Sequence, residues 1–187
     1  MTMQQLLWQG VQELNKARVP DPQLDARYLL LDAFGLGLAS FLANRGRNVD
    51  GMPGGAEKAQ VYEALITRRA ERIPLQQLLG VQEFMGLEFF VNEHVLIPRQ
   101  DTEVLVEEAL NYVRSGMDIL DVCTGSGCIL LSVLKLGEKK CRGILHGTGV
   151  DLSREALQVA EENAGRLQVE ATFLHSDLFA EVQGQYD

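Results

Sequence analysis

The sequence predicts an α/β chain in two parts, a small helical bundle followed by a region with a parallel β-sheet. Apolar residues recur at helical spacing through the first 73 residues, where glycine-rich breaks separate the helices. From residue 117 onward, short apolar runs of strand length alternate with longer runs of helical period. Strands that alternate with helices favour a parallel sheet connected by right-handed crossovers.

Residues 1–73 are expected to form an N-terminal domain of four or five helices. Asp21 and Pro22 are a typical N-cap and first-turn pair, because the N–H group that proline lacks has no helical partner at that position. The predicted helices span residues 4–17, 22–34, 38–44 and 56–73.

Residues 74–100 are predicted to be a linker that contains a β-hairpin. Pro74 ends the helical pattern, and residues 84–97 are richer in aromatic and β-branched side chains. Asn92 and Glu93 are the predicted turn between two short strands.

Residues 101–187 are predicted to form the second domain. Asp101 or Thr102 is the expected N-cap of a helix that runs through Leu110. The order that follows is strand 117–122, helix 126–136, strand 144–150, helix 154–165 and strand 170–175. The sheet is therefore expected to be parallel, with helical crossovers.

The segment 119–131 carries the strongest functional signal in the chain. Its apolar residues predict a buried strand through Val122 and then, after a turn with Gly125 and Gly127, a helix. Glycine lets the backbone approach a ligand closely, and the helix N-terminus presents free N–H groups to it. A strand, a glycine turn and a helix in this order are typical of a nucleotide-type cofactor loop.

The residues around this loop indicate which cofactor it holds. A dinucleotide fingerprint needs a third glycine where the chain has Leu130, and no lysine follows the glycines as in a phosphate-binding P-loop. An acidic residue, Asp121, precedes the loop, and Asp151 follows the next strand about 20 residues on, where a ribose-binding carboxylate is expected. A cofactor without phosphate fits this turn, and S-adenosylmethionine is the obvious candidate.

Four segments, taken in order, closely resemble the release-factor glutamine methyltransferases of the HemK/PrmC type. The glycine loop alone would be a weak sign, since many class I methyltransferases share it, whereas four motifs in the right order are specific. Residues 80–87 and the helical region before them resemble the same family, so the likeness covers essentially the whole chain. The four segments are LIPRQDTE at 96–103, DVCTGSGC at 121–128, GVDLS at 149–153 with the alanine-rich run after it, and SDLF at 176–179.

The resemblance implies the first half of a class I, Rossmann-like methyltransferase sheet and a set of cofactor-binding residues. Asp151 would bind the ribose, whereas Asp177 would accept from the adenine amino group and Leu178 would cover the ring. Pro98, Arg99 and Thr102 are further candidates, expected to close over the amino-acid end of the cofactor. The alternative interpretations, in which these residues bind no cofactor, are a simple tight turn for the loop and an ordinary loop carboxylate for Asp177. The implied cofactor-binding set is Asp121, Cys123, Thr124, Gly125, Ser126, Gly127, Asp151, Asp177 and Leu178.

The activity implied by the resemblance is methylation of a glutamine side-chain nitrogen in the Gly-Gly-Gln motif of peptide chain release factors, in translation termination. In that family an Asn-Pro-Pro-Tyr motif orients the weakly nucleophilic amide nitrogen. The motif is absent from this sequence, which ends at Asp187. We therefore expect a truncated chain that supplies the cofactor half, holds no catalytic residue and is inactive alone.

The charge of the chain limits the classes of substrate that it is expected to bind. The net charge of −9 lacks the clustered positive charge that a non-specific grip on nucleic acid requires, so a protein substrate is favoured. Two alternatives stay open: a nucleic-acid adenine N6-methyltransferase, and a catalytically inactive module that binds S-adenosylmethionine or a partner. The helical domain is expected to be either a structural cap or a docking domain for the release factor.

The remaining polar and sulfur-containing residues suggest no further chemistry. The three cysteines lack the paired short spacings of a zinc site, so no metal is expected, and a reducing cytoplasm is the simplest compartment. No apolar run has the length of a membrane span, and no membrane partner is expected. Glu103, Glu107 and Glu108 are most simply a solvated helix face, and Phe89 is expected in the core.

Overall fold

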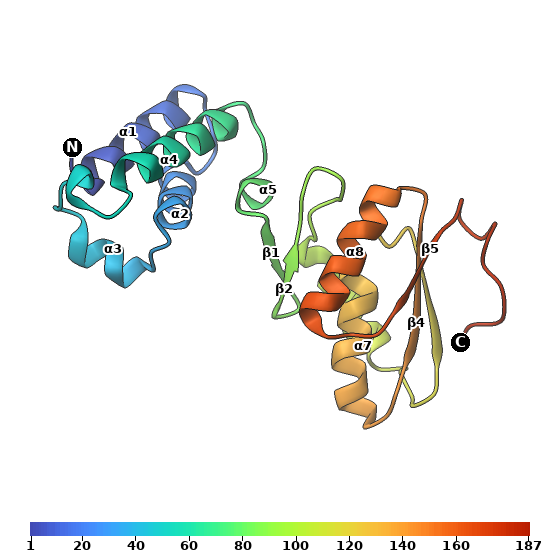
Figure 1. The fold of residues 1–187 in the computed structure, drawn as a ribbon. Coiled ribbons are helices and arrows are strands. Elements are labelled where there is room, and N and C mark those ends of the chain that lie inside the picture. Colours follow the sequence, from blue (N-terminus) through green and yellow to red (C-terminus); the bar gives the residue numbers. More distant parts are fainter. The chain divides into compact units, whose positions relative to one another are not determined.

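The computed structural model describes residues 1–187 and divides them into two compact units, Met1–Leu79 and Gly80–Asp187 (Figure 1). The first unit is helical, and the second contains a hairpin, a parallel sheet and three helices. The predicted fold class is confirmed. The predicted linker begins at Pro74, whereas the compact helical unit runs through Leu79.

The helices of the first unit occur where apolar periodicity predicts them, with ends shifted by a few residues. The N-terminus of the first helix is a capping box, in which the Thr2 hydroxyl accepts from the Gln5 N–H and the Gln5 side chain accepts from the Thr2 N–H. Asp21 occupies the predicted N-cap, although its side chain accepts no capping hydrogen bond. The helices are α1 (Met3–Lys16), α2 (Pro22–Phe34), α3 (Leu38–Asn44), α4 (Gly55–Ala70) and α5 (Leu75–Leu79).

Two features fix the packing of this unit. Gly10 lets α1 approach α4 so closely that any side chain at this position would overlap the hydroxyl of the buried Tyr62. Asp25 of α2 forms an ion pair with Arg69 of α4 at 2.7 Å, and both side chains are largely shielded from water. The apolar core of the unit is thus closed by a buried charge pair between two of its helices.

Removing one partner of this pair should destabilise the helical unit strongly. Asp25→Ala leaves the Arg69 guanidinium buried without its counter-charge, so we expect a loss of about 3–5 kcal/mol in the free energy of unfolding. Urea unfolding followed by the fluorescence of Trp8, the single tryptophan of the chain, measures it. Glu13→Ala, which breaks the exposed pair with Lys16, is the control and should cost less than about 1 kcal/mol. Equal losses in the two variants would contradict this account.

The second unit begins with an antiparallel hairpin of β1 (Val81–Phe84) and β2 (Leu87–Phe90). Its turn consists of Met85 and Gly86, both with positive φ, of 54° and 69°. A turn does begin at Asn92, whose side chain accepts from the His94 N–H at 3.0 Å, but it follows β2, so the prediction that it connects the two strands is wrong. A two-residue hairpin turn needs left-handed backbone at both positions, and Met-Gly lacks the asparagine or aspartate that usually signals it.

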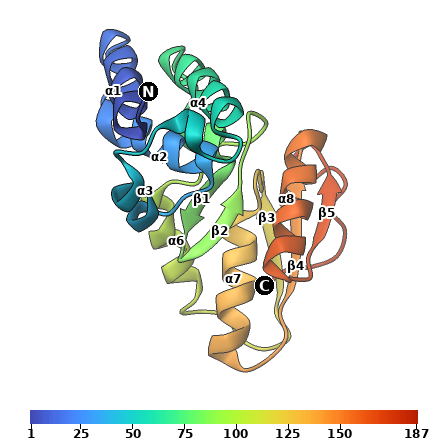
Figure 2. The ribbon, with the colours of Figure 1, turned by 60° about the vertical axis from the view of Figure 1, so that its left-hand side comes forward.

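The sheet of the second unit is parallel, with the strand order β3-β4-β5. The predicted alternation of strands and helices is confirmed, and α7 and α8 cover the same face of the sheet (Figures 1 and 2). Both lie on one face because the two crossovers run in the same direction across the sheet with the same hand. The elements are α6 (Glu103–Ala109), β3 (Asp118–Val122), α7 (Cys128–Cys141), β4 (His146–Asp151), α8 (Arg154–Leu167) and β5 (Thr172–His175).

The central strand β4 carries glycines where the structure is crowded. A Cβ atom at Gly147 would lie 2.5 Å from a Leu134 methyl carbon of α7, and one at Gly149 would lie 2.9 Å from the Phe173 ring. Glycine is required here because helix and neighbouring side chains fill the space next to the backbone. The glycines therefore let β4 pack closely against its neighbours, and Asp151 at the end of this strand lies next to the glycine loop.

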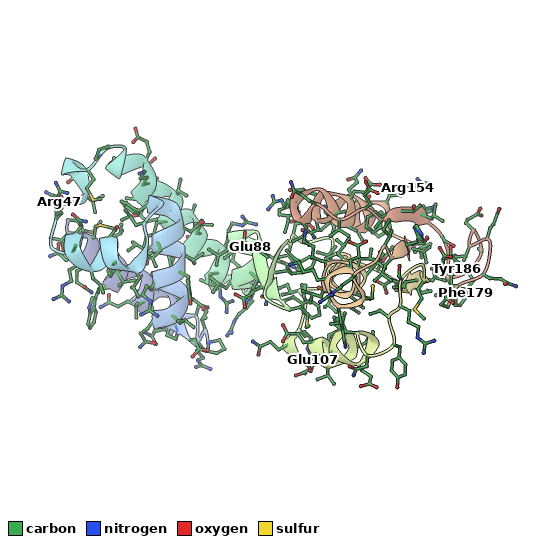
Figure 3. All side chains as sticks on the ribbon, turned by 90° about the horizontal axis from the view of Figure 1, so that it is seen from below. Arg47, Glu88, Glu107, Arg154, Phe179 and Tyr186 are labelled. Carbon is green, nitrogen blue, oxygen red and sulfur yellow. The ribbon has the colours of Figure 1, made fainter.

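Thr102 occupies the predicted N-cap of α6, whereas the acidic cluster that follows it is not entirely the expected solvated face. The side chain of Thr102 makes no capping hydrogen bond, and a 3₁₀ turn, Gln100–Thr102, precedes the helix. Glu103 is not simply part of a solvated face, because its carboxylate accepts from the Met85 N–H at 2.7 Å and so holds the hairpin turn. Glu107 and Glu108 are exposed, and Glu107 lies on the outer side of α6 (Figure 3).

No single helix of the chain is long and apolar enough to cross a membrane. The helices α2 and α3 together reach the necessary length and composition, but the chain bends by 89° between them.

Candidate cofactor-binding site

The glycine loop lies between the end of β3 and the start of α7. Its backbone is fixed by hydrogen bonds from Thr124 N–H to the Val150 carbonyl at 2.9 Å and from Gly127 N–H to the Thr124 carbonyl at 2.8 Å. Gly125 and Gly127 have φ values of 54° and 77°, which glycine adopts at little cost. The left-handed Gly127 is the N-cap of α7, so the loop feeds directly into a helix N-terminus.

Asp151 connects this loop to the neighbouring strand. One of its carboxylate oxygens accepts from the Gly125 N–H at 2.9 Å, and the other accepts from the Ser153 N–H at 2.9 Å. The parallel register that sets Val122 beside Val150 brings the ends of β3 and β4 together and makes the first bond possible. Each oxygen keeps a further lone pair, so the carboxylate can still accept from ligand hydroxyls.

Asp121 is the second carboxylate at the loop. Its Oδ2 accepts from the Thr124 hydroxyl at 2.7 Å. Burial raises the pKa of Asp121 above its usual value, and the nearby Asp151 charge adds to the rise, while the bond from Thr124 opposes it. A buried carboxylate with a raised pKa next to a glycine loop is suited to meet a cationic group, which would stabilise its charged form.

The segment after β5 holds Asp177 and Leu178 at the same end of the sheet. The Ser176 N–H donates to the Asp151 carbonyl at 3.0 Å, which ties this segment to β4. The Ser176 hydroxyl bonds the Leu178 carbonyl at 2.8 Å and fixes the turn. Asp177 and Leu178 are exposed, and so is Phe179, which Figure 3 shows on the same segment as Tyr186. The sheet thus brings Asp151 and Asp177 to one end.

No side-chain hydrogen bond joins the loop backbone to Asp177, to Leu178 or to the four predicted residues described next. Cys123 is exposed and has a φ of 63°, so its place in the loop is one of backbone geometry. Pro98 is buried and Arg99 exposed, and Arg99 donates to Asp101 at 3.1 Å. Thr102 donates from its N–H to the Arg99 carbonyl. The hydrogen bonds of Arg99 and Thr102 stay within their own segment.

Sequence reasoning missed Asn163 of α8. Its side chain is fully buried and makes three hydrogen bonds, two with Phe90 of β2 and one with the Ser126 carbonyl of the loop. A polar residue within an amphipathic helix resembles many solvent-facing ones, and its partners lie far away in the chain. Its position among the alanines of a strongly apolar helix face was the only available signal.

An apolar cavity of about 340 Å³ runs along β3 and α7 and is also lined by residues of α6. Of the predicted cofactor residues, Asp121 alone lines it. No group of three or more His, Cys, Asp or Glu side chains is arranged to hold a metal ion.

The fold and the loop define the class of protein, since this sheet, glycine turn and pair of carboxylates are those of the S-adenosylmethionine-dependent methyltransferases. Two family models match the chain, the PrmC N-terminal domain at residues 5–80 and the methyltransferase small domain at residues 100–187. Together with the relatives described next, they show that the chain is similar to the release factor glutamine methyltransferases over nearly its whole length.

Curated relatives match nearly the whole chain. The release factor glutamine methyltransferase of Koribacter versatilis is 35% identical, with 98% of this chain and 62% of the relative covered. That of Moorella thermoacetica is 40% identical, with 98% and 63% covered. The chain thus spans about three fifths of the length of these relatives. A solved ribosomal protein L11 methylase from Lactobacillus delbrueckii subsp. bulgaricus is 28% identical with a TM-score of 0.38, covering 47% of this chain and 44% of that one, and adds nothing on the site.

Gly127 should be the least replaceable glycine of the loop. An alanine there would combine a left-handed φ of 77° with a Cβ 3.0 Å from a Leu131 methyl carbon, so we expect Gly127→Ala to cost about 1–3 kcal/mol. Gly165→Ala is the matched control, because Gly165 lies in α8 with nothing near its Cβ position, and it should stabilise by about 0.5–1 kcal/mol. Urea unfolding followed by hydrogen exchange of the β3–β5 amides measures both. The same sign in the two variants would contradict the assignment.

Asp121 should make the stability of the second unit depend on pH. Because its folded pKa is raised, its contribution is fully present below the unfolded value of about 3.9 and is lost as pH rises through the folded value. Asp121→Asn removes the buried charge, so its stability relative to the unsubstituted chain should improve as pH rises above about 4. Unfolding in urea at stepped pH values measures this difference. A difference that stays constant, or that moves the other way with pH, would argue against the buried charge.

Proposed function

We propose that this chain is the cofactor-binding part of an enzyme that transfers the methyl group of S-adenosylmethionine to N5 of the glutamine in the Gly-Gly-Gln motif of peptide chain release factors. Relatives named for that activity match 98% of the chain and support the proposal. The single observation that carries the cofactor role is the Asp151 carboxylate bonded to the Gly125 N–H at the mouth of the loop.

The residues at the carboxyl end of the sheet fit the parts of this cofactor. Asp151 accepts from the ribose hydroxyls with the lone pairs that its backbone bonds leave free. Asp177 accepts from the adenine amino group, and the exposed side chains of Leu178 and Leu152 offer apolar surface to the ring. The backbone of residues 123–127 lies along the cofactor, as glycines without side chains permit.

The amino-acid end of the cofactor lies toward Asp121 in this proposal. Its carboxylate organises the loop through Thr124 and faces the cationic end of the ligand. Pro98, Arg99 and Thr102 close over that end. When bound, S-adenosylmethionine supplies an electrophilic methyl group on a sulfonium, and the protein contributes position and electrostatics. We assign no catalytic residue to the chain.

The helical unit helps to dock the release factor in the same proposal, and the protein acts in the cytoplasm. The net charge of −9 argues against nucleic acid as the substrate.

Calorimetric titration with S-adenosylhomocysteine should give saturable binding that Asp151→Ala abolishes or weakens by about 100-fold, because a partly buried charged acceptor is lost. Glu170→Ala is the control, since this exposed carboxylate precedes β5 at the opposite end of the sheet, and it should bind as the unsubstituted chain does. NAD should not bind. A chain that circular dichroism shows to be folded but that binds neither ligand would refute the cofactor assignment.

The transfer step is tested on this chain joined to the carboxyl-terminal remainder of the Moorella thermoacetica relative. Radiolabelled methyl groups should reach a release factor with Gly-Gly-Gln and not its Gly-Gly-Ala variant. Transfer to adenine-containing DNA instead would favour the nucleic-acid alternative, and binding without any transfer would favour an inactive module.

A further inference from the structure

Asn163 is the one fully buried amide side chain of the second unit, and all of its hydrogen-bonding groups in the structure are directed at backbone. Its Oδ1 accepts from the Phe90 N–H at 2.7 Å, and its Nδ2 donates to the Phe90 carbonyl at 3.0 Å. Its Nδ2 also donates to the Ser126 carbonyl at 2.9 Å. The side chain therefore pairs with β2 as a neighbouring strand would and reaches the glycine loop with its second N–H.

The hairpin end of this link is held by more than one bond. Arg166, one helical turn beyond Asn163, lies over the Phe90 ring at 4.8 Å from its centroid. Glu162 orients Arg166 through hydrogen bonds of 3.0 Å and 2.6 Å. The backbone of Phe90 and its ring are thus fixed on α8 by two different residues. This leaves the Asn163 amide little freedom to turn away from the loop.

The bond from Asn163 to the Ser126 carbonyl comes from α8, whereas the other hydrogen bonds of the loop come from elsewhere. Thr124 and Gly125 form hydrogen bonds with partners in the loop itself or in β3 and β4, and these bonds position the first half of the loop. Asn163 alone holds the Ser126 carbonyl, next to the left-handed Gly127 that begins α7. Ser126 is 2% exposed, so a carbonyl released from Asn163 would have little water to bond with.

We propose that Asn163 is a positioning residue for the cofactor loop, and that through it the docked hairpin sets the loop geometry on which cofactor affinity depends. The proposal rests on the cofactor role argued above and extends it to a residue that does not touch the ligand. Asn163 acts by holding the carbonyl of Ser126, so that the turn at residues 125–127 presents its N–H groups in one fixed orientation.

The test compares Asn163→Asp with two controls. The aspartate keeps an acceptor for the Phe90 N–H but turns an acceptor toward two carbonyl oxygens. We expect its Kd for S-adenosylhomocysteine to rise by about ten-fold or more, measured at a temperature where every variant is folded. Val133→Ala, in the same core but away from the loop, controls for lost stability. Glu161→Gln controls for a change on the same helix, because Glu161 is exposed and its side chain makes no hydrogen bond to the hairpin or the loop. Both controls should bind within about two-fold of the unsubstituted chain.

Hydrogen exchange of the ligand-free chain gives a second reading that does not depend on cofactor binding. Asn163→Asp should speed exchange in residues 124–128 while leaving the later turns of α7 unchanged, whereas Val133→Ala should not. If the unsubstituted chain fails to bind S-adenosylhomocysteine, the proposed function falls, and the exchange pattern still decides the role of Asn163. Loop exchange and affinity in Asn163→Asp equal to those of Val133→Ala would overturn the inference. If Asn163→Asp does not fold, Asn163→Ser, which keeps one donor, is judged by the same comparison.

Discussion

The hydrogen bond from the Gly125 N–H to the Asp151 carboxylate is the constraint on which the candidate site depends. It joins the loop after one strand to the end of the next, and it exists only because β3 and β4 are parallel and in a register that ends them together. Parallel strands place all their carboxyl ends at one edge, where crossover loops meet. Asp121, Asp151 and Asp177 come together for this reason, although they are far apart in the chain.

The three carboxylates at this edge of the sheet repel one another, and a positively charged ligand would reduce the repulsion. Asp121 is buried and close to Asp151, and both effects raise its pKa. A cationic cofactor would reverse this by stabilising the charged form, whereas a phosphate-bearing one would add repulsion. The same carboxylates thus favour a sulfonium ligand over a dinucleotide, in agreement with the missing third glycine at Leu130.

Polar side chains that bond to backbone connect the parts of the second unit. Glu103 holds the turn of the hairpin from α6, Asn163 holds its second strand from α8, and Asp151 holds the loop from β4. Each satisfies backbone groups that lie outside the regular ladders. The two-stranded hairpin, which would be marginal alone, is stabilised by this docking.

The sequence by itself determined the helical bundle, the alternation of strands and helices, the parallel sheet and the loop with its carboxylates, because periodicity and glycine placement are local signals. It misplaced the hairpin turn, since Met85–Gly86 carries no familiar turn signature. Only the tertiary structure decided the roles of Asn163, Glu103 and the Asp25–Arg69 pair. Asn163 bonds a residue 73 positions away, and such contacts depend on how elements pack, which no local pattern encodes.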